Sequence, residues 1–195
     1  MNYKNLFKKV LLLISSPAKA WEEISLEEDR RRGLATFVYP MIGLCGMAVF
    51  ANVFIYNFAS EDFTPNQLFQ LAMTKCCAVF VAFFAGFFLA AKIVSKMARS
   101  LFRVDCDMPK AEQLVGYAMA VPFILKILVE LVPPFYILKL IFQFYIIYVI
   151  WEGARVLLKM NENKSSWFSI FSSLVIIFCP FFIELIFNKL TAILN

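Results

Sequence analysis

The chain has 195 residues, of which 62% are hydrophobic and 17% are charged, and its mean hydropathy is +0.74. A soluble domain of this length has about 45–50% apolar and about 25% charged residues, so the composition excludes an ordinary soluble protein. The net charge of +5 comes from basic residues at the ends of apolar blocks, so we expect lipid contacts and no nucleic-acid partner. The chain has no histidine, which removes Ser-His and Cys-His nucleophile pairs and most zinc sites. We therefore expect no enzyme, no metal and no cofactor.

The first 33 residues predict cytoplasmic, amphipathic helices that lie on the membrane surface. A secretory signal is the alternative, but the apolar run Val10–Ile14 is shorter than such signals need, and Pro17 follows it closely. Ser16-Pro17 is typical of the start of a second helix, which we expect to run from Ala18 to about Asp29. The first helix has an apolar face of Leu6, Phe7, Val10, Leu11 and Ile14, with Lys4 and Lys8 on the other face.

Five apolar blocks follow, and each is close to the roughly 20 residues that cross a bilayer as a helix. We therefore predict an all-α, polytopic transmembrane helix bundle over residues 34–195. Thr64-Pro65 is a good helix start, and Pro133-Pro134 predicts a tight hairpin between the third and fourth spans. The predicted spans are about 34–58, 68–94, 113–132, 135–151 and 167–187.

Lysines and arginines alternate across these spans. The N-terminal region, the four loops and the C-terminal tail hold 7, 0, 4, 0, 3 and 1 of them in that order. Because cytoplasmic loops carry the excess of basic residues, the N-terminus is predicted inside and the C-terminus outside. We expect an integral protein of the plasma membrane, and in a bacterium of the inner membrane.

The second span carries a stripe of small residues, Ala78, Ala82, Gly86 and Ala90, spaced four residues apart. Small residues allow membrane helices to approach closely, so we predict a packing face here. The partner helix belongs either to the same chain or to another one, as in a homo-oligomer or a complex with a second membrane protein. Pro122 and Pro180 begin similar five-residue segments, each of which ends in an ionisable residue four positions later. Either an internal duplication or coincidence explains this similarity.

Five ionisable residues lie inside the apolar blocks, in the half of each span predicted to be outermost. A charge at this depth is expensive, so it must pair, face a cavity or reach the membrane surface. Lys126 and Glu130 are four residues apart and predict a local ion pair, whereas Glu184 needs a lysine from another span. The alternatives are structural ion pairs, a pocket for an anionic ligand such as a lipid headgroup, and a proton or ion relay. The candidate residues are Lys75, Lys126, Glu130, Lys139 and Glu184.

Of the five cysteines, only Cys106 lies in a predicted loop, and the spacing predicts no structural disulfide. Asp105 and Asp107 flank it. Two carboxylates in a charged loop are usually only solvated, so we do not assign a metal site to this segment.

Three segments resemble the YIP family of Ypt/Rab-interacting membrane proteins, and its short prokaryotic branch in particular. They are Ser-Ser-Pro-Ala-Lys-Ala-Trp-Glu-Glu-Ile at 15–24, Tyr39-Pro40-Met41-Ile42-Gly43, and Gly116-Tyr117-Ala118-Met119-Ala120-Val121-Pro122. The resemblance implies five spans, a cytosolic N-terminal contact surface and no enzymatic activity, with Tyr39, Pro40, Gly116, Tyr117 and Pro122 as family positions.

Two functions are compatible with these features. The first is a non-enzymatic membrane scaffold that engages anionic lipid or a partner through its N-terminus and cytoplasmic loops. The alternative is a small transporter or lipid-handling protein with an anionic-ligand pocket, which requires the intramembrane charges to converge on one cavity.

Overall fold

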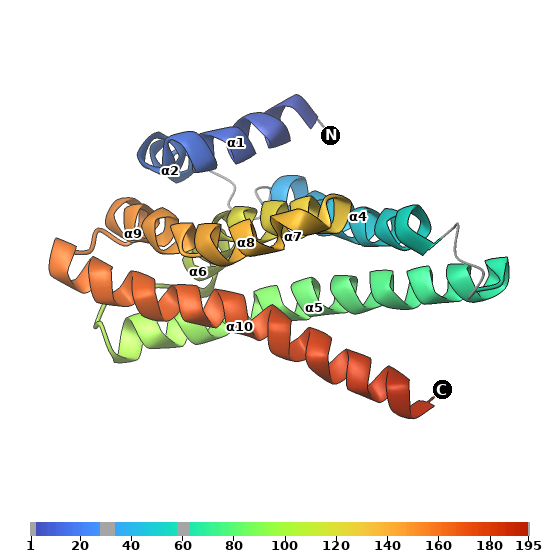
Figure 1. Ribbon diagram of the computed structural model, residues 1–195. Coiled ribbons are helices and arrows are strands. Elements are labelled where there is room, and N and C mark those ends of the chain that lie inside the picture. The colour runs from blue at the N-terminus through green and yellow to red at the C-terminus, as the bar shows by residue number, and fades with distance from the viewer. Residues whose placement is uncertain (1–2, 28–33, 58–62, 195) are drawn as a thin grey trace.

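The computed structural model describes residues 3–27, 34–57 and 63–194, and the regular elements within them are all helices. Arg30, Arg31 and Arg32, the predicted basic run, and Glu61 and Asp62 of the first loop lie outside these residues. The elements are α1 Tyr3–Ser15, α2 Pro17–Ser25, the π-helix η1 Leu34–Val38, α4 Tyr39–Asn57, α5 Pro65–Ser100, α6 Met108–Ala118, α7 Ala120–Leu131, the 3-10 helix η2 Pro133–Phe135, α8 Tyr136–Phe142, α9 Tyr145–Leu157 and α10 Glu162–Leu194 (Figure 1).

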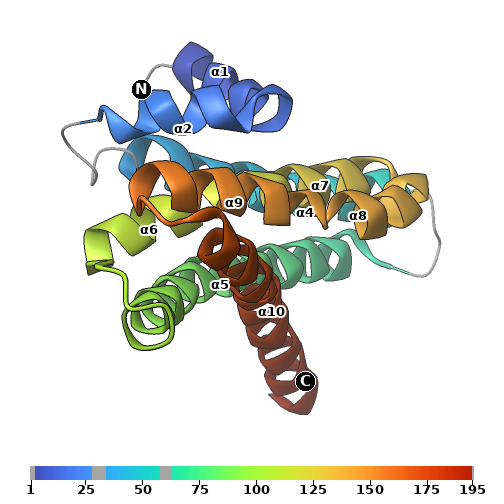
Figure 2. The same ribbon diagram turned by 90° about the vertical axis from the view of Figure 1, so that its left-hand side faces the viewer.

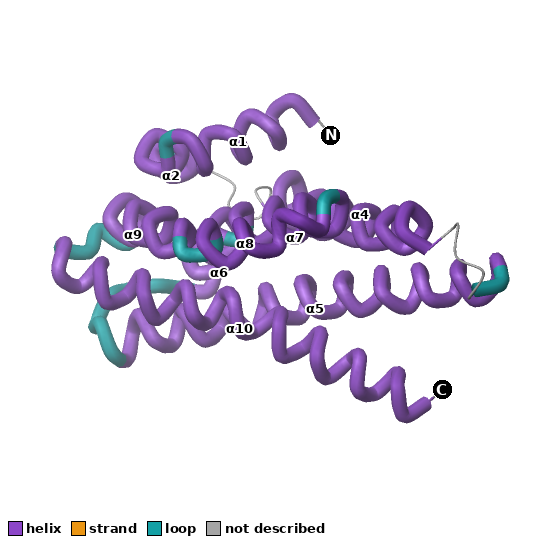
Figure 3. The backbone as a smooth tube through the Cα atoms, viewed as in Figure 1, coloured by secondary structure: helices purple, strands orange, loops and turns teal. Residues whose placement is uncertain are grey.

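The helices form three layers, which both ribbon views show (Figures 1 and 2). Helices α1 and α2 form the top layer, helices α4 and α6 to α9 the middle one, and helices α5 and α10 the bottom one. The connections that the structure describes in full are short, as the teal loops in Figure 3 show. One continuous core of buried apolar residues runs through the three layers, from Leu6 in α1 to Ile176 in α10.

The helices identify an integral membrane protein with a polytopic bundle. In the described part of the chain, four helical segments are long and apolar enough to cross a membrane: Ala35–Asn57, Pro65–Ser100, Met108–Leu131 and Glu162–Ile193. A fifth candidate, Pro133–Phe142 with Tyr145–Leu157, is bent by 43°. The predicted hairpin is present, because α7 ends at Leu131 and α8 begins after the Pro133-Pro134 turn.

Two helical segments extend beyond the predicted spans. The fifth candidate runs to Leu157, past the predicted end at residue 151, and is broken between Phe142 and Tyr145. Helix α5 continues to Ser100 through the first part of the predicted second loop. Its 36 residues extend about 54 Å at ~1.5 Å per residue, more than the hydrocarbon thickness of roughly 30 Å.

Proline positions explain two irregular helical segments. Pro122 has no amide hydrogen to donate to the carbonyl group of Ala118, and the third span breaks between Ala118 and Ala120. The π-helix η1 ends just before Tyr39-Pro40, where the next helix begins. Pro180, in contrast, lies inside the continuous helix α10.

The small-residue stripe of α5 is buried, and its partner belongs to the same chain. Ala78, Ala82 and Ala90 are almost completely inaccessible, and Gly86 faces Pro180 of α10. A Cβ atom at Gly86 would lie 2.9 Å from the backbone Cα and N of Pro180, closer than side chains pack. Glycine at this position is therefore what allows α5 and α10 to cross.

The loop between α5 and α6 is ordered by its own acidic residues. Asp107 caps α6 by accepting a hydrogen bond from the Lys110 amide at 3.1 Å, and Asp105 pairs with Lys110 at 3.4 Å. The Cys106 carbonyl accepts a hydrogen bond from Ser95 at 2.8 Å. Burial of the Cys106 side chain raises its pKa to about 11, so this thiol is neutral at physiological pH.

We expect Gly86→Ala to destabilise the fold by about 1–3 kcal/mol, because the new methyl group meets backbone atoms of Pro180 that have no side-chain freedom to move. Gly43→Ala is the matched control, since a Cβ atom at Gly43 meets nothing within 4 Å. The free energies of unfolding of both variants in mixed detergent–SDS micelles measure the difference. Equal stability of the two variants would contradict the close α5–α10 crossing.

Candidate functional site

Trp21 anchors the N-terminal helices to the bundle. It projects from α2 and is 0% exposed, and its indole Nε1 donates a hydrogen bond to the carbonyl of Val149 in α9 at 2.7 Å. The ring occupies the space beside Gly153, where a Cβ atom would come within 2.7 Å of it. A buried indole with its N–H satisfied is a strong, directional contact, so it holds α2 in one place on α9.

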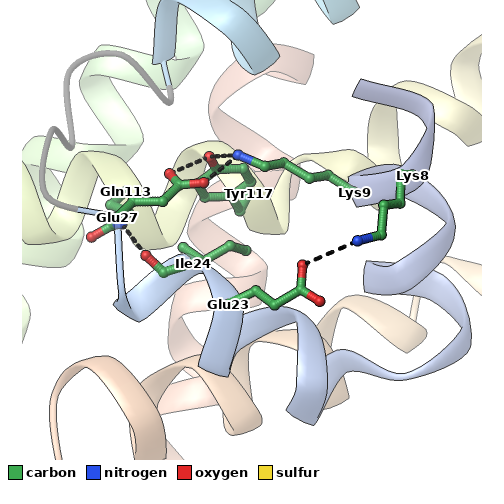
Figure 4. Close-up of polar contacts among 7 residues, drawn as sticks. All are labelled: Lys8, Lys9, Glu23, Ile24, Glu27, Gln113 and Tyr117. Carbon is green, nitrogen blue, oxygen red and sulfur yellow. Dashed lines mark hydrogen bonds and ion pairs between the residues drawn. The ribbon is translucent and has the colours of Figure 1, made fainter. Parts of the chain in front are cut away.

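A polar cluster of Lys9, Glu27 and Tyr117 provides the second anchor (Figure 4). The ammonium group of Lys9 in α1 forms an ion pair with Glu27, which follows α2. Lys9 also donates a hydrogen bond to the Tyr117 hydroxyl at 3.1 Å, and that hydroxyl donates to Glu27 at 2.9 Å. Each of the three side chains contacts the other two, so the cluster joins α1, the end of α2 and α6.

Two further hydrogen bonds satisfy the C-terminal ends of α1 and α2. Gln113 donates to the carbonyl of Ile24 at 3.0 Å, which Figure 4 also shows, and Tyr145 donates to the carbonyl of Ile14 at 2.6 Å. The last carbonyl groups of a helix have no partner within the helix. These side chains from α6 and α9 therefore fix the C-terminal ends of α2 and α1 on the bundle.

The predicted apolar face of α1 divides between two environments. Leu6 and Val10 are buried against the rest of the protein together with Leu13, which was not part of the prediction. Phe7, Leu11 and Ile14 point away from it and are 53%, 65% and 39% exposed. The basic residues Lys4 and Lys8 are exposed, and Lys8 makes a long ion pair with Glu23, at 3.9 Å.

The intramembrane charges form a second polar site between α7 and α10. The Lys126 ammonium group lies 3.2 Å from a carboxylate oxygen of Glu130, as the predicted i, i+4 pair, and 3.2 Å from one of Glu184. Pro122 precedes Lys126 by four residues, and Pro180 precedes Glu184 by four residues. The two similar sequence segments, 122–126 and 180–184, therefore face each other in space.

A cavity of about 320 Å³ opens beside this pair. Lys126, Glu184 and Lys139 all reach it, whereas Glu130 pairs with Lys126 without lining it. Lys75 lies elsewhere: it is exposed on α5 and forms no ion pair or hydrogen bond in the described part of the chain. The remaining lining residues are Phe83, Pro122, Leu125, Tyr136, Leu140, Gln143, Ile176, Ile177, Phe178, Pro180 and Phe181.

The model of the Yip1 domain matches residues 11–183 of the chain. The chain belongs to the Yip1 domain family. Neither the curated proteins nor the solved structures contain a significant match to it. The matched range includes the whole of α2 and the last five residues of α1, whereas residues 3–10 of α1 precede it.

Two of the five residues predicted as family positions lie at the polar sites, one at each. Tyr117 belongs to the cluster with Lys9 and Glu27, beside the buried Gly116, and Pro122 lines the cavity. Tyr39 begins α4, and its ring packs on Phe84 of α5 at a centroid distance of 5.7 Å. Pro40 follows Tyr39 and is partly buried.

Sequence reasoning missed Lys9, Glu27 and Gln113 as docking residues of the Yip1 domain. One signal was available: Lys9 lies three residues after Leu6 and four before Leu13, so it shares their helix face. Lys9 belongs to the N-terminal region for which we expected lipid or partner contacts, but it is committed to an internal ion pair with Glu27. Nothing in the local sequence indicates that Gln113 meets Ile24, because the pairing depends on how α2 lies on α6.

We expect Trp21→Ala to release α1 and α2 from the Yip1 domain without unfolding the spans. A buried tryptophan truncated to alanine loses about 3–5 kcal/mol, and the space beside Gly153 would be left empty. Hydrogen–deuterium exchange in nanodiscs should show faster exchange of the α1 and α2 amides. Trp167→Ala is the control, because Trp167 on α10 is 63% exposed and should leave the exchange of α1 and α2 unchanged. Unaltered protection in Trp21→Ala would show that the anchor lies elsewhere.

Proposed function

We propose that this protein is a non-enzymatic membrane scaffold. Its N-terminal helices lie on the anionic cytoplasmic surface of the membrane, and its cytoplasmic loops are available there to a partner. The observation that carries this proposal is the exposed side of α1. Phe7, Leu11 and Ile14 remain accessible although α1 is held by buried contacts on its other side.

The exposed side of α1 has the composition of a membrane-surface helix. Three apolar side chains at i, i+4 and i+7 lie next to the exposed amines of Lys4 and Lys8. Apolar side chains enter the boundary between headgroups and acyl chains, and each nearby basic residue adds about 1 kcal/mol of attraction to anionic lipid. Because α1 is already fixed to the bundle, binding does not have to order it, which lowers the entropic cost.

The distribution of basic residues supports an inner-membrane protein with its N-terminus in the cytoplasm and its C-terminus outside. In this orientation the α5–α6 loop and the α9–α10 loop face the cytoplasm with the N-terminal helices. These three segments would make a continuous surface for a partner. The lack of histidine supports a role without catalysis.

The small-residue stripe does not contribute to recruitment in this proposal. It is occupied by α10 of the same chain, so a homo-oligomer or a membrane-protein partner would have to use another surface.

The orientation predicts opposite accessibility at the two ends of α5. In a chain without its native cysteines, Asn66→Cys should react with a membrane-impermeant maleimide in intact spheroplasts, and Ser100→Cys only after lysis. Both positions are exposed in the fold, so any difference in labelling reports the compartment. Labelling of both positions from the same side would contradict the orientation.

We expect a nitrobenzoxadiazole dye on Leu11→Cys to report an apolar environment in nanodiscs that contain phosphatidylglycerol. Its emission should shift to the blue relative to the same dye on Glu22→Cys, an exposed position of α2. Lys4→Gln combined with Lys8→Gln should reduce the shift in anionic nanodiscs and change little in neutral ones. Water-like emission at position 11 in both lipids would refute contact between α1 and the membrane surface.

A further inference from the structure

Among the residues that the structure describes, the cavity between α5, α7, α8 and α10 contains one cation, Lys139, without a carboxylate in ion-pair contact. Lys126 is neutralised by two carboxylates, but Lys139 has no carboxylate within ion-pair distance among the residues described. The Lys139 ammonium group lies over the ring of Tyr136, at 5.9 Å from its centroid. An unpaired ammonium group inside an apolar segment is costly, so a bound anionic group would stabilise it.

The charges of the whole cavity indicate a ligand that carries a positive group as well as a negative one. Lys126 with Glu130 and Glu184 carries a net charge of −1, and Lys139 adds +1, so the site is neutral overall. A purely anionic ligand would satisfy Lys139 but would meet the surplus carboxylate charge of Glu184, which also lines the cavity. A ligand with both a phosphate and an ammonium group matches both charges.

We propose that this cavity binds the headgroup of a zwitterionic phospholipid that carries a primary amine, with its phosphate at Lys139 and its ammonium group at Glu184. Gln143 and the Tyr136 hydroxyl also line the cavity and can supply hydrogen bonds to the phosphate or glycerol oxygens. This ligand differs from the anionic lipid headgroup that was one of the alternatives from the sequence, because Lys126 has two carboxylate partners and is not available to such a ligand.

The surroundings of the cavity favour a lipid over a soluble metabolite. A volume of about 320 Å³ is at the small end of ligand pockets and suits a headgroup rather than a whole lipid. Most of the lining is apolar, and α8, which forms one wall, has no buried residues along its length. Ile137, Ile141 and Phe142 on its outer side are highly exposed. A single thin helix therefore separates the headgroup site from the surrounding acyl chains.

Native mass spectrometry of the intact chain in mild detergent tests the proposal. Added phosphatidylethanolamine should give a saturable adduct that binds several-fold more tightly than phosphatidylglycerol, phosphatidylcholine or diacylglycerol. Lys139→Gln should weaken this adduct by about tenfold, the loss expected for one charge-assisted hydrogen bond. Lys75→Gln removes an exposed lysine of α5 outside the cavity and should bind as the unaltered chain does.

A second pair of variants locates the lipid. Leu140→Trp fills the cavity from α8 and should abolish the tight adduct, whereas Ile137→Trp adds the same ring on the exposed side of α8 and should not. Equal binding by the two tryptophan variants, or by Lys139→Gln and Lys75→Gln, would overturn the proposal. Tighter binding of phosphatidylglycerol than of phosphatidylethanolamine would contradict a zwitterionic ligand. Displacement of bound phosphatidylethanolamine by soluble phosphoethanolamine at equal concentration would contradict a lipid as the source of the headgroup.

Discussion

The need to pair every polar group that is removed from water governs this structure. In an apolar environment an unsatisfied charge or hydrogen-bonding group costs several kcal/mol, so polar side chains of the spans become the contacts that fix helices together. Lys126 illustrates the rule, because its two carboxylate partners connect α7 internally and join α7 to α10. Asn52 of α4 follows it as well, by donating a hydrogen bond to the Glu130 carbonyl at 2.6 Å.

The same rule explains how the N-terminal helices are held. Apolar packing of Leu6 and Val10 alone would leave α1 free to slide, because dispersion contacts are not directional. The indole of Trp21 and the hydroxyl of Tyr117 each require a partner in a defined direction. The directional contacts therefore set the position of this layer, and the apolar ones supply most of its stabilisation.

The third span links the two polar sites. Tyr117 on α6 contacts the N-terminal helices, and Lys126 on α7 lines the cavity, with the break before Ala120 between them. Lys126 lies nine positions after Tyr117, so the two sites are within about 14 Å of helix length along the third span. The scaffold and the lipid cavity that we propose thus share a structural element, although each rests on its own contacts.

The amino-acid sequence by itself determined the class of the protein, the approximate spans, the proline turn and the i, i+4 pair of Lys126 and Glu130. These features depend on periodicity and local spacing, which a linear chain carries in full. The tertiary structure alone decided that Glu184 pairs with Lys126 rather than with Lys75 or Lys139, that α10 covers the stripe at Gly86, and that Lys9 turns inward to Glu27. Each of these contacts joins residues from different helices, so it depends on the rotation and crossing of the helices, and no local pattern in the chain encodes that geometry.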